Sequence, residues 1–407
     1  MASIFSFPEY KMVSVALFLL CFGIVSGCGV DNENNDSVKV QGVKNLMVYT
    51  KDQNPDTVIL SRELVYGDTM NVLFRSMRDF TVDTAGRVYI TDAARGVKKI
   101  HQFKPDGNYI KSIGGEGRGP REFLGPCCLK IKNEQLFVYD HRQFKVNIYS
   151  TEPLSYQKSY TITPGELAAS SQGRIFSHSY YFLTDSTYLV GFSESLSPDN
   201  LKNRYADYYR ANRKWEKSSG KLFSQLRPKI MLGDFQGKKI YERFPFFEKS
   251  LMAVSRKGYI YRAQTDSFLV KKYDKEGNYL EGFYYPYQRA SVNREDALNA
   301  TNTMTRGIAK GMDLPKHWPV LNSMEFDDKN RLWISTITNS REKLQWWVLD
   351  KDGKLIARFR WAGKRAEQAY GLEPDILVRN GFFYVQEKNK STEGRRVVKY
   401  RINISSR

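Results

Sequence analysis

One short pattern of hydrophobic and polar positions recurs along the chain. An apolar residue is followed by a polar turn containing Asp, Gly or Asn, and then by an apolar or aromatic strand. The first copy is VDTAGRVYI, Val82–Ile90, and the others begin at Ile131, Leu183, Val254, Phe326 and Val378. Because such turn residues tolerate positive φ and the flanking apolar residues pair across two strands, each of the six copies predicts a tight β-hairpin.

A second hairpin follows several of these copies. It is clearest at Val97–Gly114, Phe268–Phe283 and Trp346–Phe359, where an Asp-x-x-Gly or Asp-Gly turn separates two strands. Two hairpins in series give four antiparallel strands, which is one blade of a β-propeller. Six such units over residues 46–407 average about 60 residues, and a bare blade needs about 40–50. The pattern therefore predicts an all-β protein with a single six-bladed propeller, in which several blades carry insertions.

The largest break in the repeat lies at about residues 194–250. Its fifty residues from 201 to 250 contain 13 Lys and Arg, 5 Asp and Glu, and ten aromatic residues. Arg binds carboxylate and phosphate through two parallel hydrogen bonds, and flat rings suit the face of a sugar. This composition makes an anionic or sugar ligand one interpretation, with contacts from Arg204, Tyr205, Tyr208, Tyr209, Arg213 and Trp215. The alternative is an outer hairpin of blade three, with a solvated basic face and packed tyrosines.

A second insertion, at about residues 286–320, has the features of a short helix. Ser291 and Asn293 are candidate N-caps, Glu295 and Asp296 fall in the first turn, and Gly307 would weaken the helix. We expect it to cover one face of the ring, either as a structural plug or as a lid.

The first unit, from Gly86 to Phe123, closely resembles an NHL repeat. The strand ending in Asp92, the strand at Phe103, the turn at Asp106 and the glycine-rich tail Gly114–Gly119 carry this resemblance. The chain as a whole resembles the six-bladed β-propeller lipoproteins common in Bacteroidetes. That resemblance implies a fold and a cell-envelope location, but no settled activity. The glycine tail lacks the strand and helix of a dinucleotide fingerprint, so we interpret it as a turn between blades.

A strand before the first repeat also fits this family. Val58–Val65 is expected to pair with the last blade and close the ring, which removes an open sheet edge.

The N-terminus predicts export and lipidation. Met12–Ile24 is an almost wholly apolar run of 13 residues, too short to span a membrane but suited to a secretory signal. Val25, Ser26, Gly27 and Cys28 follow and resemble a bacterial lipobox, in which the cysteine thiol accepts acyl chains. We therefore expect a signal peptide over 1–27, lipidation at Cys28 and a flexible tether over 28–45. The outer membrane is the expected partner of those acyl chains, with the protein on its periplasmic side or at the cell surface.

Composition changes this picture in one respect. Apolar residues make up 41% of the chain and charged residues 26%, which excludes a polytopic membrane protein and a mostly disordered chain. The formal charge is +19, and removal of the leader leaves it unchanged. Export makes nucleic acid an unsuitable partner. The local excess of +8 in residues 201–250 instead draws attention to the basic insertion.

Signals for catalysis are weak. The four histidines, His101, His141, His178 and His317, have neither HxH nor HExxH spacing and are interpreted as surface or hydrogen-bonded residues. Asp92 and Asp140 end matching strands and are expected to cap turns, the alternative being carboxylates in the channel. No metal site, cofactor or catalytic residue is predicted.

The adjacent Cys127 and Cys128 are expected to be two reduced thiols, the alternative being a strained vicinal disulfide. Their Cα atoms, about 3.8 Å apart across a trans peptide, lie closer than in an ordinary disulfide.

Three functional hypotheses remain open. The first is a non-enzymatic envelope module that binds a protein complex or an anionic glycan through one face of the ring. The second is a metal-dependent enzyme of the propeller lyase or lactonase type, and the third is a structural subunit of an outer-membrane assembly.

Overall fold

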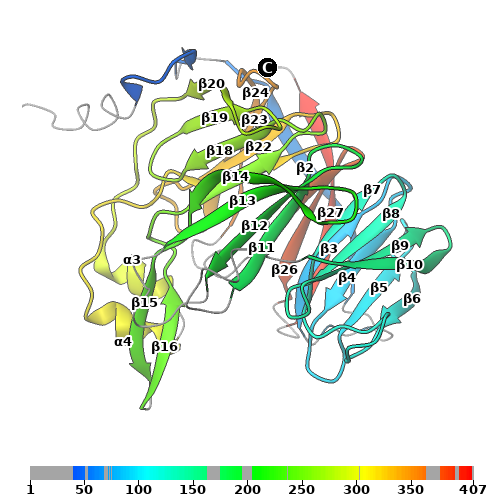
Figure 1. Ribbon diagram of the computed structural model, residues 1–407. Coiled ribbons are helices and arrows are strands. Elements are labelled where there is room, and N and C mark those ends of the chain that lie inside the picture. The colour runs from blue at the N-terminus through cyan, green and yellow to red at the C-terminus, as the bar shows by residue number, and fades with distance from the viewer. Residues whose placement is uncertain are drawn as a thin grey trace, which may run out of the picture. The chain divides into compact units, whose positions relative to one another are not determined.

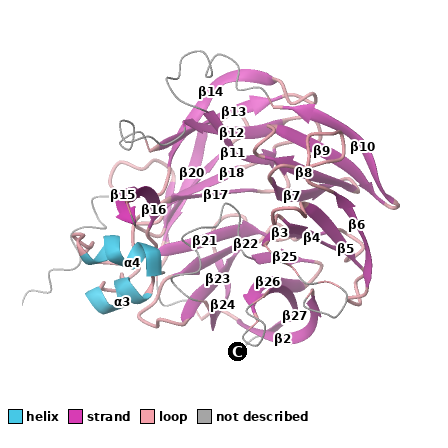
Figure 2. Ribbon diagram, turned by 90° about the horizontal axis from the view of Figure 1, so that it is seen from below, coloured by secondary structure: helices cyan, strands magenta, loops and turns pink. Residues whose placement is uncertain are grey.

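Six antiparallel sheets are arranged around a common centre (Figure 2). The computed structural model describes residues 40–50, 54–67, 72, 74, 76–162, 175–194, 204–235, 237–301, 303–363, 376–389 and 394–405. The expected signal peptide, Cys28 and most of the expected tether lie outside these residues. The fold prediction is confirmed, because the chain is an all-β, six-bladed propeller with two short helices.

The first three blades follow the chain in order, and each has four strands. Blade one contains β3 (Met77–Val82), β4 (Val88–Asp92), β5 (Lys99–Phe103) and β6 (Tyr109–Gly114). Blade two contains β7 (Pro126–Lys132), β8 (Gln135–Asp140), β9 (Lys145–Thr151) and β10 (Leu154–Thr161). Blade three contains β11 (Ile175–Phe182), β12 (Tyr188–Glu194), β13 (Tyr205–Ala211) and β14 (Lys217–Leu226).

The other three blades contain the remaining repeats. Blade four contains β17 (Ser250–Val254), β18 (Ile260–Gln264), β19 (Leu269–Tyr273) and β20 (Tyr279–Tyr284). Blade five contains β21 (Leu321–Phe326), β22 (Leu332–Thr336), β23 (Lys343–Leu349) and β24 (Leu355–Ala362). Blade six contains β25 (Ile376–Arg379), β26 (Phe382–Lys388) and β27 (Arg395–Ser405). Each predicted repeat spans the turn between the first and second strands of a blade.

The ring closes through the N-terminal strand, as the sequence predicts. Strand β2 (Thr57–Tyr66) pairs antiparallel with β27, in a register that runs from Thr57 opposite Ser405 to Tyr66 opposite Val397. Blade six therefore takes its fourth strand from the other end of the chain. Along β2 the faces alternate, since Val58 is 5% exposed and the adjacent Ile59 is 53% exposed.

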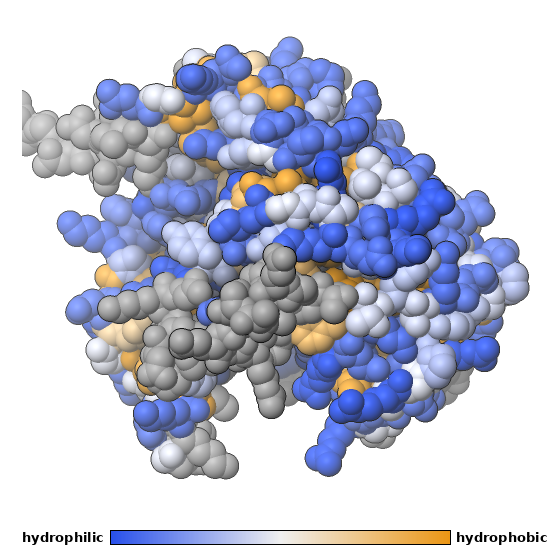
Figure 3. Space-filling model, viewed as in Figure 1, coloured by the Kyte–Doolittle hydropathy of each residue, from blue (hydrophilic) through white to orange (hydrophobic). Residues whose placement is uncertain are grey.

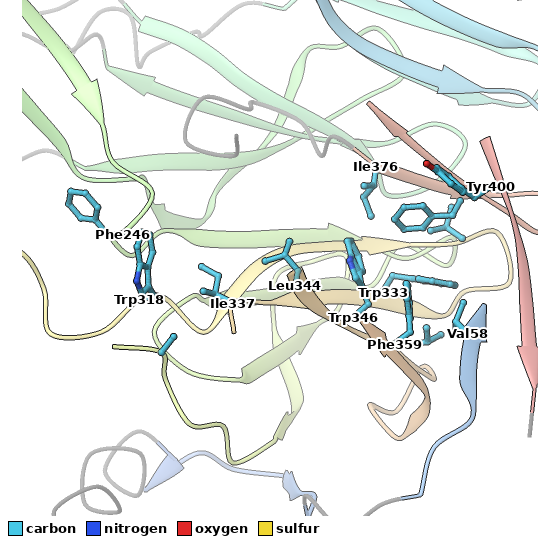
Figure 4. Close-up of a cluster of buried hydrophobic side chains, with 14 of the residues drawn as sticks. Val58, Phe246, Trp318, Trp333, Ile337, Leu344, Trp346, Phe359, Ile376 and Tyr400 are labelled. Carbon is cyan, nitrogen blue, oxygen red and sulfur yellow. The ribbon is translucent and has the colours of Figure 1, made fainter. Parts of the chain in front are cut away.

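The largest hydrophobic cluster lies between blades five and six and reaches the helical insertion (Figure 4). Trp346 stacks on Phe359 with ring centroids 6.2 Å apart, and Trp333 meets the same ring edge-on at 6.0 Å. Phe246 and Trp318 lie together at the other end of the cluster. Burial of these rings and of Val58 joins the closing strand to the hydrophobic core. By contrast, the face seen in Figure 3 is mostly hydrophilic, with hydrophobic residues in small patches.

The basic insertion is shorter than the sequence pattern indicates. Residues 205–226 form the two outer strands of blade three, and the described chain after them leaves the repeat. There β15 (Ile230–Phe235) and β16 (Lys238–Arg243) make a separate hairpin. The helical insertion contains two helices, α3 (Arg294–Asn299) and α4 (Thr303–Lys310), beside that hairpin (Figure 1). Asn293 caps α3 as expected, because its Oδ1 accepts from Asp296 N at 2.7 Å.

One additional strand was not predicted. Strand β1 (Leu46–Val48) pairs in parallel with β20 and gives blade four a fifth strand. The preceding Asn45 donates from Nδ2 to Leu280 O at 3.0 Å. Lys44 O also accepts from Tyr279 Oη at 2.5 Å, so the last two residues of the expected tether contact blade four. Within the described residues, no helix has the length and apolar character needed to cross a membrane.

The alternation along β2 provides a direct test of ring closure. Replacement Val58→Asp places a charge in the core and should lower the free energy of unfolding by about 3 kcal/mol. The matched change Ile59→Asp, on the exposed face of the same strand, should cost about 0.5 kcal/mol. Urea unfolding monitored by tryptophan fluorescence measures both. Equal losses would contradict the assignment of β2 as a closing strand with one buried face.

Candidate functional site

A cavity of about 440 Å³ lies where the inner strands of the six blades converge. Strands β3, β7, β11, β17, β21 and β25, with the turns that follow them, line it. Ten of the lining residues are charged, and they are Asp79, Lys130, Lys132, Glu134, Asp185, Arg256, Glu325, Asp327, Asp328 and Arg379. Cavities of this size hold small molecules, and convergent polar groups confer specificity. This central channel is the candidate functional site.

Blades two and three supply a cationic and aromatic side. The Lys130 ammonium lies over the Tyr181 ring, 5.0 Å from its centroid. Lys132 lies over Phe182 at 5.3 Å, and its Nζ is 3.1 Å from Asp185 Oδ1. Rings of this kind attract cations through their negative faces. The two lysines are therefore held at the channel by rings of the neighbouring blade.

Blades five and six supply an acidic side with one arginine among the carboxylates. Burial lowers the pKa of Arg379, and the nearby carboxylates of Glu325 and Asp328 oppose that shift. The Nε of Arg379 is buried without a hydrogen-bond partner. Arg256 of blade four donates from Nη1 to Asp328 O at 2.8 Å. The channel thus carries charges of both signs on both sides, and Arg379 retains a hydrogen-bond donor.

Two of the channel carboxylates serve the fold. Asp79 is 7% exposed, and its Oδ2 accepts from Leu129 N of the next inner strand at 2.5 Å. Asp327 accepts from Arg331 Nε at 2.7 Å and from Trp333 Nε1 at 2.9 Å. Asp83 has the same role in blade one, where it accepts from Arg87 Nε and Tyr89 Oη. Because these buried carboxylates accept hydrogen bonds that hold strands and turns in place, we assign them a structural role.

The six aromatic and basic candidates of the insertion do not form one surface. Tyr208, Tyr209 and Trp215 are 2%, 5% and 0% exposed, and Trp215 stacks on Tyr188 with centroids 3.9 Å apart. These three rings are core residues of blade three and its neighbours. Their burial supports the packed-tyrosine interpretation and removes them from a surface ligand site. Tyr205 is 53% exposed, Arg213 is exposed, and Arg204 is half-buried.

The described histidines lie away from the channel lining. His141 follows blade two's second strand, and its Nδ1 is 2.7 Å from Gly125 O. His317 lies in the helical insertion, beside Ser291. His101 differs from the expectation of a surface or hydrogen-bonded residue, because both ring nitrogens are buried without a partner. It packs edge-on against Phe74 at 5.3 Å. The side chain of His178 lies outside the described atoms.

Burial of His101 makes stability depend on pH. Desolvation lowers its pKa below the usual 6.5, so the folded state binds its proton more weakly than the unfolded state. The stability that depends on the neutral His101 imidazole is therefore complete above about pH 6.5, and it is lost as the pH falls below that value. The change His101→Phe should reduce the loss of unfolding free energy between about pH 7.5 and pH 5.5. Urea titrations at both pH values measure this difference, and identical losses in both proteins would contradict it.

The strand-end aspartates cap turns, as expected. Asp140 is fully buried, and its carboxylate accepts from the backbone N–H groups of Leu124, Gly125, Arg142 and Gln143. Asp92 accepts from Ser76 N at 3.0 Å and from Ala94 N at 3.1 Å. Neither residue lines the cavity.

The adjacent cysteines are buried thiols at the start of β7. Cys128 donates from Sγ to Cys127 Sγ at 2.8 Å, and its φ is 55°. The pairing of β7 with β8 shifts between Cys127 and Lys130, so the pair lies in an irregular segment of the inner strand. Among the residues that the structure describes, no group of three His, Cys, Asp or Glu side chains is placed to hold a metal ion.

Comparison with known proteins establishes the fold. A family model described as a 6-bladed beta-propeller, DUF5128, matches residues 71–188. A member of the DUF4221 family from Bacteroides vulgatus aligns with a TM-score of 0.53 at 11% identity, covering 87% of this chain and 100% of that chain. A protein described as exported, from Bacteroides fragilis, aligns with a TM-score of 0.47 at 11% identity, covering 88% of this chain and 99% of its own.

A catalytically inactive variant of virginiamycin B lyase from Staphylococcus aureus aligns with a TM-score of 0.37 at 10% identity, covering 85% of this chain and 99% of that one. No curated protein matches the sequence. At these identities the likeness concerns the fold and not the activity.

Proposed function

We propose that this protein is an exported, lipid-anchored propeller of the Bacteroidetes lipoprotein type, with NHL-like repeats, that acts as a non-enzymatic binding module. The central channel is its binding site, and the ligand is a polar group carrying both charges, presented by an envelope protein or a glycan. The observation that supports this proposal best is that charged residues of both signs, from several blades, line one channel. Lysines of blade two lie on one arc and carboxylates of blade five on the other.

The geometry favours binding over a metal-assisted reaction. Asp79 and Asp327 are committed to hydrogen bonds within the fold, and no described histidine lines the cavity. The described residues provide no three-residue set for a metal. The other charged groups of the channel include the cations Lys130, Arg256 and Arg379 and the carboxylates Glu325 and Asp328. They suit recognition of a ligand that carries both charges. A structural subunit would use the same ring face to contact its assembly.

A peptide and glycan array tests this channel. The full-length protein is applied at two salt concentrations beside the channel variant Lys130→Gln/Arg256→Gln. Because both cations face the cavity, their loss should weaken the array signal about tenfold, and wild-type binding should fall with added salt. The control Lys275→Gln/Arg395→Gln removes two exposed cations elsewhere and should bind as wild type. Equal binding by the channel variant would contradict the proposal.

Lipid attachment has an independent test. Cys28→Ser removes the acyl-accepting thiol, so the protein should lose palmitate label and move from the membrane to the soluble fraction. Each buried CH₂ of an acyl chain contributes about 0.8 kcal/mol to membrane binding, which is why loss of the chains should release the protein. The matched variant Cys127→Ser keeps the anchor and should stay with the membrane. Retained label in Cys28→Ser would refute lipidation at this residue.

A further inference from the structure

Three arginines converge where blade three ends and the β15–β16 hairpin begins. Arg204 precedes β13 and Arg227 follows β14, and their backbones are joined by Arg227 N donating to Arg204 O at 2.6 Å. Arg204 also donates from Nη2 to Arg227 O at 3.1 Å. Arg243 ends β16 opposite Ile230, which is close to Arg227 along the chain. Residues that are 39 positions apart in sequence therefore share one corner of the molecule.

Two of these guanidinium groups, those of Arg204 and Arg227, are incompletely hydrogen-bonded. Arg227 is 8% exposed, and its Nη1 donates to Glu194 O at 3.1 Å. The Nε groups of Arg204 and Arg227 are buried without a hydrogen-bond partner. Burial lowers the pKa of all three arginines, and for Arg227, where Arg243 adds to the effect, to about 10. A buried cation with unused donors is unfavourable unless something pairs with it.

Carboxylates of the fold offset this charge only in part, since Glu242 opposes the lowering of the Arg243 pKa by burial. Within the described part of the chain, none forms an ion pair with Arg204, Arg227 or Arg243. The nearest acidic influence on Arg204 is Glu248, and that side chain is 3.3 Å from Arg289. The cluster thus keeps an excess of positive charge at a position where water has limited access. An oxyanion entering the corner would accept the unused N–H groups and lower the repulsion between the arginines.

We propose that this arginine cluster, Arg204, Arg227 and Arg243, is a binding site for the oxyanion of an anionic glycan, carried as a sulfate, phosphate or carboxylate. The sugar is favoured over a free ion by the surface beside the cluster. Tyr241 lies two residues before Arg243 on β16, so the two side chains share a face of the strand. Its ring is 37% exposed. An exposed ring beside a guanidinium suits a sugar face that bears a charged substituent.

This site is separate from the central channel. The turn between β11 and β12 carries Asp185, which lines the channel, whereas Glu194 at the far end of β12 contacts Arg227. The seven residues of β12 place these ends about 20 Å apart. Loss of binding at the arginine cluster can therefore be distinguished from loss of binding at the central channel, because different residues form the two sites.

Calorimetric titration of the full-length protein tests the arginine cluster. The probes are a sulfated oligosaccharide, its desulfated form and inorganic sulfate. We expect the sulfated sugar to bind more tightly than either of the other two. Arg204→Gln and Arg243→Gln should each weaken it about tenfold, because each removes charge-assisted hydrogen bonds. Arg227→Lys keeps the charge but loses the planar fork, and should also weaken binding.

Arg213→Gln is the matched control, because Arg213 is exposed at the other end of the β13–β14 hairpin. It should bind within about twofold of wild type, since an exposed charge remote from the ligand contributes little. Unchanged binding by Arg204→Gln and Arg243→Gln, each shown to be folded by urea unfolding, would overturn the proposal. The proposal would also be overturned if Arg213→Gln lost as much affinity for the sulfated sugar as the cluster variants do. Equal affinities for the sulfated and desulfated sugars would overturn it as well.

Discussion

The pairing of β2 with β27 is the interaction on which the rest of the structure depends. Each blade has two faces that must be covered by its neighbours, and in a ring every blade has two neighbours only when the circle is complete. The antiparallel register from Thr57 to Tyr66 completes blade six with a strand from the opposite end of the chain. Val58 then enters the largest hydrophobic cluster with Trp333 and Trp346. Without a disulfide in the described core, ring closure and apolar burial provide the cohesion.

Closure also creates the channel. In each blade the first strand pairs on one side only, so six inner edges face a common space. Some backbone groups of these inner edges form hydrogen bonds within the fold. For example, Leu129 N of β7 donates to the Asp79 carboxylate of β3. Other groups, such as Lys130 over Tyr181, are positioned by rings of the neighbouring blade. The scaffold therefore presents charged groups from different blades to one cavity, although they are far apart in sequence.

Variation between blades is concentrated in the insertions. The β15–β16 hairpin and the two helices depart from the repeat, while residues 205–226 keep it. The distinction matters for charge, because Arg204, Arg227 and Arg243 meet only where the repeat gives way to the hairpin. Their burial and unused donors contrast with Arg213, an exposed residue of the same basic segment. The position of an arginine in the fold, rather than the local composition, therefore distinguishes the proposed arginine cluster from a solvated basic surface.

The sequence by itself determined the six hairpin repeats, the closing strand at Val58 and the Asn293 cap, because each depends on local alternation and turn chemistry. It also indicated that Asp92 and Asp140 cap turns. Only the tertiary structure decided which aromatic residues of the insertion are buried. Tyr208 packs in the cluster shared with blade four and Tyr209 in the cluster shared with blade two, so both neighbouring rings are buried because neighbouring blades cover both faces of blade three. The channel lining and the arginine cluster likewise arise from long-range packing, for which a linear pattern of residue types contains no signal.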